Sequence, residues 1–474
     1  MVRAMRFSCS ARMPCYPAWL TSITKTPPPS PLSPSFSPTL HPSGLVRSGV
    51  APDHLEVKQV TNDFEEVASS DRFGFLGNVC VGRDVSVAEL QGCYDSVVFA
   101  YGASSDRDMG VPGEGLAGVC SARAFVNWYN GHPDFVDFRP NLDTEDVVIV
   151  GQGNVAIDCA RILCKTPKEL EGSDIAAHAA QALARSRVKR VHVVGRRGHI
   201  QAAMTMKELR EITRLEDAHF LVHPSELQAG RTPASLKEAE AARARKRMDA
   251  LLAEEAVKGA LQHSKSRTLS LRFLLSPKAC LPAQGAAGVG GVQLERNRLE
   301  GAPEAQKAVG TGEVEVIPAG LVLKSIGYKS LPITGLPFDA KSATVPNARG
   351  RVLAGAGAAP LPGLYCTGWV KRGPSGIIGT NITDAKETVA CLLEDLGAAG
   401  KGSGADGSSS SSSSKGGLQQ LKAMLQAKGK RAGQSMDWKG WLKVNAMEIE
   451  RGAKVGKPRE QVTSVAARLE SGGH

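Results

Sequence analysis

The turn GQGNVA, from Gly151 to Ala156, constrains the fold of this chain more than any other feature of the sequence. It follows the apolar run DVVIV and precedes IDCARILCK, so it lies between a predicted strand and a predicted helix. Gly151 and Gly153 permit a tight bend and the close approach of a pyrophosphate, Ala156 lets the helix pack on the strand, and the helix N-terminus faces the phosphate charge. This setting predicts a dinucleotide-binding α/β unit, which we expect to extend over residues 146–330.

Two arginines end the second strand of this unit, which we predict within RVKRVHVVG. A site for NAD places an acidic residue there, whereas Arg196 and Arg197 suit the 2′-phosphate of NADP through charge-assisted hydrogen bonds. They lie farther from Gly151 than the usual ~20 residues, and we attribute the excess to an inserted helix, SDIAAHAAQALARS. The alternative is a solvated basic turn.

The length and composition of the chain exclude few functions. Its 474 residues leave room for two or three domains, and no apolar run reaches the roughly 18 residues that span a bilayer, although a peripheral membrane contact stays open. The formal net charge of +11 belongs to the two ends, because residues 51–400 carry 40 basic and 41 acidic residues. We therefore expect no nucleic acid as a partner of the core. The ten cysteines show no C-x-x-C spacing, which argues against a redox dithiol, a zinc ribbon or a compact iron–sulfur ligand set.

Several further segments can be assigned from local pattern. Residues 1–43 have the Ser-, Pro- and Arg-containing, acid-free composition of an organelle transit peptide, with a wrongly predicted first exon as the alternative. NVCVG predicts a strand, SVAELQGCY a helix, DSVVFAYGA a buried strand and SARAFVNWYNG a helix. LSLRFLL, GVQLE and VEVIPAGLVLKSIG predict further strands. Residues 399–417 read as a flexible Gly/Ser linker and residues 418–474 as a helical tail.

Five separated stretches together resemble the adrenodoxin reductase family, the mitochondrial NADPH-dependent ferredoxin reductases: GLVRSGVAPDH, GQGNVAIDCARILCKTP, VVGRRGHIQAAMTMKELREI, SIGYKSLPI and GLYCTGWVKRGPSGIIGTNITD. The resemblance runs from about Gly44 to Leu396 and resumes from Asp437 to Glu460. It implies an α/β fold with two Rossmann-like dinucleotide-binding domains, in which an NADP domain (146–330) is inserted between two parts of an FAD domain (44–145 and 331–398). It also implies a location in the mitochondrial matrix, with or without a contact to the inner membrane.

By this resemblance the first domain is incomplete. Relatives carry a first G-x-G-x-x-G turn before the segment matched by GLVRSGVAPDH, whereas this chain has TPPPSPLSPSFSPTLHPS there, and prolines cannot build a central strand or a helix. We therefore expect the leading FAD-binding β-α-β, with its pyrophosphate cradle, to be missing, and the chain as given to bind FAD poorly. We favour an exon omitted from the gene model, because the rest of the flavin site persists; a damaged flavoprotein is the other explanation.

The resemblance also implies individual site residues. For FAD they are Leu45 in a loop against the flavin, Val81 on the adenine side, and a group near the isoalloxazine ring: Trp369, Gly376, Ile377 and Ile378. For NADP they are Gln152, Gly153, Asn154 and Val155 in the turn, Arg196 and Arg197 at the 2′-phosphate, and Glu208 in KELRE. The alternative for Trp369 is a residue of the core; without the family, Glu208 would be read as a surface carboxylate that pairs with Lys207 or Arg210.

The implied reaction is hydride transfer from NADPH to FAD, followed by single electrons to a ferredoxin with a 2Fe–2S cluster. It depends on alignment of the two rings, so we name no catalytic acid or base and no metal. A small acidic ferredoxin needs a basic docking face, for which the candidates are Arg210, Arg214, Arg243, Arg245, Lys246 and Arg247. The alternative for these residues is a solvated helix face beside Glu238 and Glu240.

Two other functions remain open from the sequence. One is a non-catalytic protein that binds NADP and cannot hold FAD, which the missing β-α-β favours. The other is a related flavoprotein such as a glutamate synthase small subunit. The absence of clustered cysteines and the presence of GWVKRGP count against the second.

Overall fold

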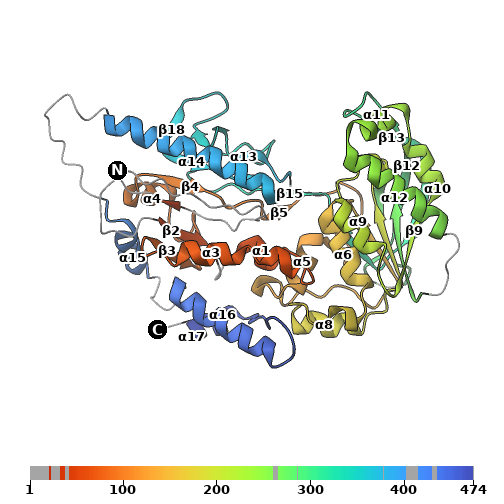
Figure 1. Cartoon of the computed structure of the whole chain (residues 1–474), viewed down its shortest axis with the longest axis horizontal. Coiled ribbons are helices and arrows are strands. Elements are labelled where there is room, and N and C mark those ends of the chain that lie inside the picture. The colour runs from red at the N-terminus through yellow and green to blue at the C-terminus, as the bar shows by residue number, and fades with distance from the viewer. Residues whose placement is uncertain are drawn as a thin grey trace.

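The computed structural model describes residues 21–22, 33–37, 42–259, 265–285, 287–376, 378–401, 415–429 and 435–472. Two α/β lobes lie side by side along the long axis of the molecule (Figure 1). The inserted lobe, residues 119–324, is built around a six-stranded sheet, and the outer lobe is formed by the residues before and after it. Among the described residues, no helix is long and apolar enough to cross a membrane.

The sheet of the inserted lobe is entirely parallel, with strand order β6-β14-β7-β8-β10-β9. These strands are β6 (Val119–Ser121), β7 (Asp146–Val150), β8 (Arg190–Val194), β9 (Ala218–Val222), β10 (Arg267–Arg272) and β14 (Leu321–Lys324). Strand β7 is buried from Val147 to Val150, as expected for an apolar strand covered on both faces. The sheet already includes β6, so it begins earlier in the chain than residue 146.

Helices cover this sheet. They are α5 (Ala122–Tyr129), α6 (Asn154–Cys164), α7 (Pro167–Leu170), α8 (Ala177–Ala184), α9 (Met206–Ile212), α10 (Pro224–Gly230), α11 (Pro233–Ala241) and α12 (Arg243–Gly259), with 3-10 turns η1 (Pro133–Phe135) and η2 (His199–Gln201). The predicted helix after GQGNVA is confirmed as α6, and the inserted helix before the second strand is confirmed as α8. Ala156 is fully buried against the strands, which explains the small residue at that position.

A second, antiparallel sheet of three strands packs against the parallel one. It consists of β11 (Leu275–Pro282), β12 (Val289–Glu300) and β13 (Lys307–Pro318), in that order. Buried Val292 and Leu294 of β12 share a hydrophobic cluster with Val148, Val150 and Val194 of the parallel sheet. The strands predicted from GVQLE and VEVIP are therefore confirmed, within a longer hairpin than the sequence suggested.

The sheet of the outer lobe is divided. One part has five strands in the order β1-β4-β18-β17-β16, and the other has the two strands β2-β3. Their bounds are β1 (Thr21–Ser22), β2 (Ser33–Ser37), β3 (Phe73–Gly77), β4 (Val97–Phe99), β16 (Asn347–Ala348), β17 (Arg351–Leu353) and β18 (Pro360–Cys366), and a small ladder joins β5 (Ser105–Asp106) to β15 (Tyr328–Lys329). The two described residues of β1 run antiparallel to β4.

Two expectations for this lobe need correction. The strand predicted at NVCVG is wrong: β3 ends at Gly77, and Val81 only forms an isolated bridge with Val85, because Asp84 accepts a hydrogen bond from the Cys80 amide and closes a turn there. The segment 1–43, expected to lie outside the fold, contributes β1 and β2. Strand β2 pairs on one side only with β3 among the described residues, which is the edge position that a strand containing Pro34 can occupy.

Helices complete the outer lobe: α1 (Gly44–Ser48), α2 (Leu55–Lys58), α3 (Thr61–Ala68), α4 (Val87–Cys93), α13 (Trp369–Arg372), α14 (Ile378–Lys401), α15 (Gly417–Ala427), α16 (Trp438–Ala453) and α17 (Val465–Gly472). The tail is helical, as predicted, and it packs on this lobe. Leu421 and Leu425 of α15 join Leu90 of α4 in one core, and Trp441 and Val444 of α16 join Phe75 of β3 in another. Most of the expected Gly/Ser linker, residues 402–414, lies outside the described residues.

Candidate functional site

The turn after β7 is shaped to receive a phosphate. Gly151 has φ +124°, and a Cβ at this position would lie 2.1 Å from the Ser325 carbonyl oxygen, so only glycine fits. Gly153 is the N-cap of α6, and a Cβ there would meet nothing within 4 Å. No side chain of the described residues caps the helix, so its first amide groups have no side-chain acceptor, as an anion site at a helix N-terminus requires.

The side chains of this turn are bonded to neighbouring segments of the protein. Gln152 is 9% exposed, and its Nε2 donates to the Arg272 carbonyl at 2.8 Å. The Oδ1 of Asn154 accepts from the Thr205 amide at 2.9 Å, while Val155 packs against the main core. Because these polar side chains are already engaged, the turn would hold a pyrophosphate mainly through its backbone N–H groups.

Arg196 and Arg197 are both exposed at the carboxyl end of β8, next to this turn in the sheet. The only side-chain contact found for them in the described residues is a weak one, from Arg197 Nη2 to the Gln201 carbonyl at 3.4 Å. Their backbone, in contrast, is held: the Leu274 amide donates to the Arg197 carbonyl. Two unpaired guanidinium groups on an ordered backbone fit a 2′-phosphate and not a ribose hydroxyl.

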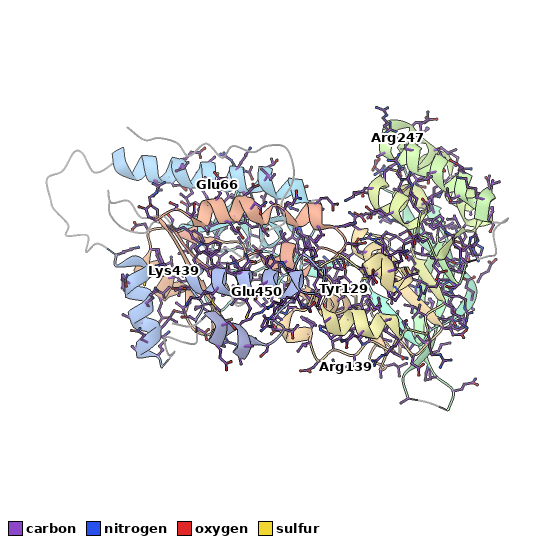
Figure 2. The ribbon with its side chains drawn as sticks, turned by 60° about the horizontal axis from the view of Figure 1, so that its bottom comes forward. Glu66, Tyr129, Arg139, Arg247, Lys439 and Glu450 are labelled. Carbon is purple, nitrogen blue, oxygen red and sulfur yellow. The ribbon has the colours of Figure 1, made fainter. Side chains whose placement is uncertain are left out.

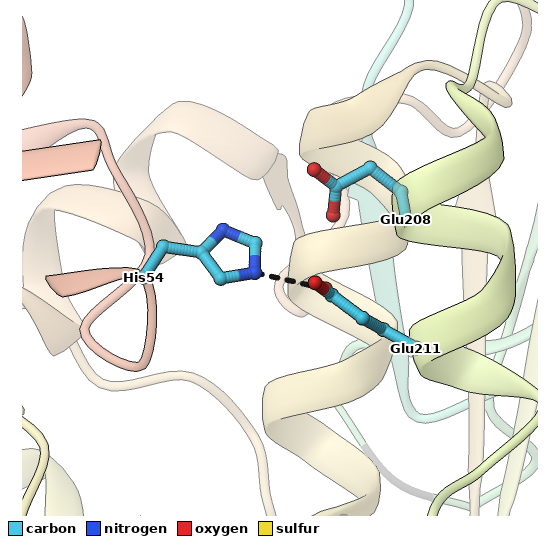
Figure 3. A group of neighbouring side chains, drawn as sticks. All are labelled: His54, Glu208 and Glu211. Carbon is cyan, nitrogen blue, oxygen red and sulfur yellow. Dashed lines mark hydrogen bonds and ion pairs between the residues drawn. The ribbon is translucent and has the colours of Figure 1, made fainter. Parts of the chain in front are cut away.

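Glu208 is not the surface carboxylate of the alternative interpretation. It is 7% exposed and, among the described residues, pairs with Arg161 Nη1 at 3.2 Å and not with Lys207 or Arg210. Figure 3 shows its carboxylate next to that of Glu211 and to the His54 ring. Burial, together with the neighbouring Asp158 carboxylate, raises the pKa of Glu208 to about 7. Its part in NADP binding stays a prediction.

Glu208 belongs to an ion-pair network that was not predicted from the sequence. Arg161, 1% exposed, lies at its centre and pairs with Asp158 at 2.8 Å and Glu211 at 3.1 Å, and bidentately with Asp53 at 2.8 and 3.0 Å. The remaining members are Lys165, which pairs with Asp53 at 2.8 Å, and His54. Asp53 lies in the outer lobe and Arg161 lies on α6 of the inserted lobe. The network therefore joins the two lobes at the helix that follows the GQGNVA turn.

His54 contributes an imidazole side chain to this network (Figure 3). Its Nε2 lies 2.8 Å from Glu211 Oε2, and its Nδ1 lies 4.0 Å from Asp158. Although burial opposes it, the hydrogen bond to Glu211 raises the pKa of His54. The sequence held one sign of these contacts. Asp53 and His54, at the end of GLVRSGVAPDH, are two polar residues between an apolar stretch and helix α2.

Three side chains of this network lie close enough together to bind one metal ion. The ligand atoms of His54, Glu208 and Glu211 are all within 4.8 Å of one another. The guanidinium group of Arg161 already pairs with both carboxylates, and the imidazole already bonds to Glu211. A fixed cation thus occupies the place that a metal ion would take, and the cluster is an ion-pair network.

A small pocket in the outer lobe matches the expected flavin-ring position. It is lined by Leu45, Ala100, Gly102, Thr367, Gly368, Trp369 and Asn381. The Trp369 ring stacks on Tyr328 with centroids 5.6 Å apart, and its Nε1 is buried without a partner in the described structure. An orphan donor beside glycines is suited to a polar ring edge.

The other expected flavin residues are less informative. Gly376 is exposed with φ +83°, where a Cβ would strike Thr380. Ile377 and the side chain of Ile378 lie outside the described residues, although α14 begins at residue 378. Val81 is partly buried and does not line the pocket.

The two ends of an FAD molecule therefore fit this chain differently. The ring end has a pocket with an orphan donor. The pyrophosphate end needs a Gly-rich turn between a central strand and a helix, and the described part of the outer lobe has its sheet divided between β4 and β3, with no such turn. The expected absence of the leading β-α-β stays a prediction, since residues 1–20, 23–32 and 38–41 lie outside the described residues.

Five of the six predicted docking residues project into solvent: Arg210, Arg214, Arg243, Lys246 and Arg247. Arg247 lies at the top of the inserted lobe in the view of Figure 2. Arg245 is different, because it forms ion pairs with Glu304 and, at 3.6 Å, with Glu238. Glu238 is 2% exposed, so Arg245 does not lie on a solvated helix face beside Glu238.

The comparisons with known proteins agree with this geometry. Residues 34–219 match the family model described as pyridine nucleotide-disulphide oxidoreductase. The chain is 46% identical to the mitochondrial NADPH:adrenodoxin oxidoreductase of Homo sapiens, over 91% of this chain and 85% of that protein, and 45% identical to that of Arabidopsis thaliana, over 89% and 86%. The solved structure of Mycobacterium tuberculosis FprA in complex with NADPH is 38% identical and superimposes with a TM-score of 0.81, over 93% of this chain and 92% of the other.

Proposed function

Since this chain belongs to the family of the NADPH:adrenodoxin oxidoreductases, we propose that it oxidises NADPH and passes the electrons one at a time to a 2Fe–2S ferredoxin. It is an oxidoreductase with FAD and NADP(H) as its cofactors. The mitochondrial names of its eukaryotic relatives support the mitochondrion as its location. The matrix side of the inner membrane is the finer location that we propose.

The observation that carries the proposal is the uncapped helix N-terminus at Gly153, with two arginines just beyond the end of the neighbouring strand that form no ion pair among the described residues. The turn binds the pyrophosphate through backbone N–H groups. Arg196 and Arg197 bind the phosphate on the ribose, which only NADP carries. Together they fix the adenine end of the nucleotide and leave the nicotinamide end to extend toward the lobe boundary.

The chain's own residues then align and enclose the reacting end. The Arg161 network holds the two lobes together beside the nucleotide turn, and Trp369 with Gly368 forms one wall of the ring pocket. FAD, when bound, supplies the acceptor for a hydride and the donor of single electrons. Alignment and exclusion of water are the contributions of the protein, and we assign no general acid or base.

A second candidate is a protein that binds NADP but does not turn over. It follows from the absence of the FAD-binding β-α-β that the sequence predicts for the N-terminal segment. The two candidates make the same prediction for NADP binding and opposite predictions for flavin. Reconstitution of the full chain with FAD, followed by filtration and an absorbance spectrum, separates them: no retained flavin supports the second candidate and excludes the first for the chain as given.

The nucleotide assignment is tested by changing Arg196→Gln and Arg197→Gln together. We expect the preference for NADP⁺ over NAD⁺ to fall about a hundredfold, because each lost charge-assisted contact weakens binding about tenfold. Calorimetric titration with both nucleotides measures this, and NAD⁺ affinity serves as the internal control. An unchanged ratio would contradict the NADP site.

A further inference from the structure

The backbone that carries the two arginines is held by a residue from the antiparallel sheet. Asn297, on β12, is 5% exposed, and its Nδ2 donates to the Arg196 carbonyl oxygen at 2.9 Å. The same Nδ2 donates to Ser276 Oγ at 2.8 Å. Its own amide donates to the Leu274 carbonyl at 2.7 Å, and the Leu274 amide donates to the Arg197 carbonyl at 3.1 Å. Asn297 thus contacts the arginine turn directly and also through Leu274.

The local backbone is irregular where this contact is made. The register between β12 and β13 shifts between Glu295 and Asn297, because a step of two residues along β12 there corresponds to a step of four along β13, from Val314 to Gly310; the ladder is irregular, as it is at a β-bulge. Bulges redirect side chains and are frequent beside functional sites. Leu274, which is 1% exposed, has φ +58°, a conformation that is costly for a side chain of this kind. Two departures from regular geometry therefore meet at one turn.

The residue before the arginines, Gly195, is held by backbone hydrogen bonds between strands, and these bonds do not involve Asn297. Gly195 donates to the Arg272 carbonyl and accepts from the Leu275 amide, so the peptide before the arginines is fixed by the sheet. The Arg196 peptide lies beyond the end of β8, and among the described contacts its carbonyl has Asn297 as its partner. Rotation of that peptide would turn both arginine side chains, because they leave the chain on either side of it.

We propose that Asn297 is a positioning residue that sets the preference for a 2′-phosphate, by fixing the peptide between Arg196 and Arg197. The inference rests on the proposed NADP function. Asn297 lies on β12, which belongs to the antiparallel sheet and not to the parallel sheet that carries the nucleotide turn. A residue from outside the parallel sheet would therefore govern the binding of the 2′-phosphate. Binding of the adenosine and of the pyrophosphate does not involve this contact, so only the 2′-phosphate should respond.

The test compares Asn297→Ala with the wild-type full chain, by calorimetric titration with adenosine 2′,5′-bisphosphate and with adenosine 5′-monophosphate. These probes differ by the 2′-phosphate and need no flavin. We expect the affinity for the bisphosphate to fall about tenfold, as for loss of one positioned hydrogen bond, and the affinity for the monophosphate to stay within about twofold. Ser276→Ala is the matched control, because it removes the other partner of Asn297 and leaves the contact to Arg196; we expect it to behave as wild type.

An equal loss for both probes would show a general structural role and overturn the proposal, and so would no change for either. If Asn297→Ala does not fold, Asn297→Ser replaces it, since its hydroxyl is too short to reach the Arg196 carbonyl. A wild-type chain without preference for the bisphosphate would refute the NADP assignment itself. A preference that is present in the wild type and kept in the variant would refute only the role of Asn297.

Discussion

At the scale of single residues, Glu208 links the ion-pair network to pH. Its pKa is raised from 4.5 to about 7, chiefly by burial. Between these values the folded protein holds a proton that the unfolded chain has lost, so this residue makes stability fall as pH rises. We expect Glu208→Gln to reduce that fall, measured as the free energy of unfolding in urea at intervals from about pH 4.5 to 7.

Asp217→Asn is the control for this prediction. A hydrogen bond from Ser266 lowers the pKa of Asp217, so its contribution is present above the unfolded value of 3.8 and is lost only as pH falls. Its removal should therefore shift stability by a constant amount across the same range. A slope in Glu208→Gln equal to that of the wild type would contradict the raised pKa.

At the scale of elements, a buried carboxylate on helix α16 adds an ion-pair network to its apolar contact with the outer lobe. Glu448 is 0% exposed and pairs with Arg47 of α1, with Arg459 at 3.1 Å and with Arg468 at 3.9 Å. Glu448→Gln would leave three guanidinium groups with no carboxylate between them. We expect a loss of about 3–5 kcal/mol in unfolding free energy, and earlier proteolysis of the tail than of the rest of the chain.

Glu450, on the same helix, is the matched control for that change (Figure 2). It is exposed and pairs with Lys454 one turn later at 2.7 Å. An exposed pair of this kind contributes little, so Glu450→Gln should change stability by less than about 0.5 kcal/mol. Equal losses in the two variants would show that the buried network does not hold the tail.

At the scale of the whole molecule, we predict that the exposed basic residues at the start of α12 form the face on which a ferredoxin docks. We expect Arg243→Glu with Arg247→Glu to lower ferredoxin reduction at least tenfold at low salt, and to leave reduction of a small artificial acceptor unchanged. Steady-state rates of the flavin-loaded enzyme with both acceptors measure this. The difference should shrink as ionic strength rises, because exposed charges are screened.

The control for docking makes the same change of charge elsewhere. Lys439 and Arg451 are exposed on α16, and Lys439 lies at the other end of the molecule from Arg247 (Figure 2). Their reversal to Glu should leave both rates near the wild-type values. Equal losses with ferredoxin in the two double variants would mean that net charge, and not a docking face at α12, governs the reaction.

Short-range pattern in the sequence was sufficient for the nucleotide turn and the elements around it. Gly151, the strand before it and helix α6 after it are contiguous, and their spacing alone dictates the geometry. The same holds for the exposed arginines, which lie where the second parallel strand ends. Where local sequence was ambiguous, as in NVCVG, a turn closed by Asp84 replaced the predicted strand.

Only the tertiary structure brought together the residues that hold these local features in place. Arg161 meets Asp53, and Asn297 meets Arg196, across long stretches of chain, and Glu448 meets Arg47 across almost the whole of it. A polar residue viewed alone gives no sign of its partner, because burial and contact arise from packing of elements that are distant in sequence. The sequence by itself determined which ligand chemistry the chain carries, and packing decided which side chains fix it in position.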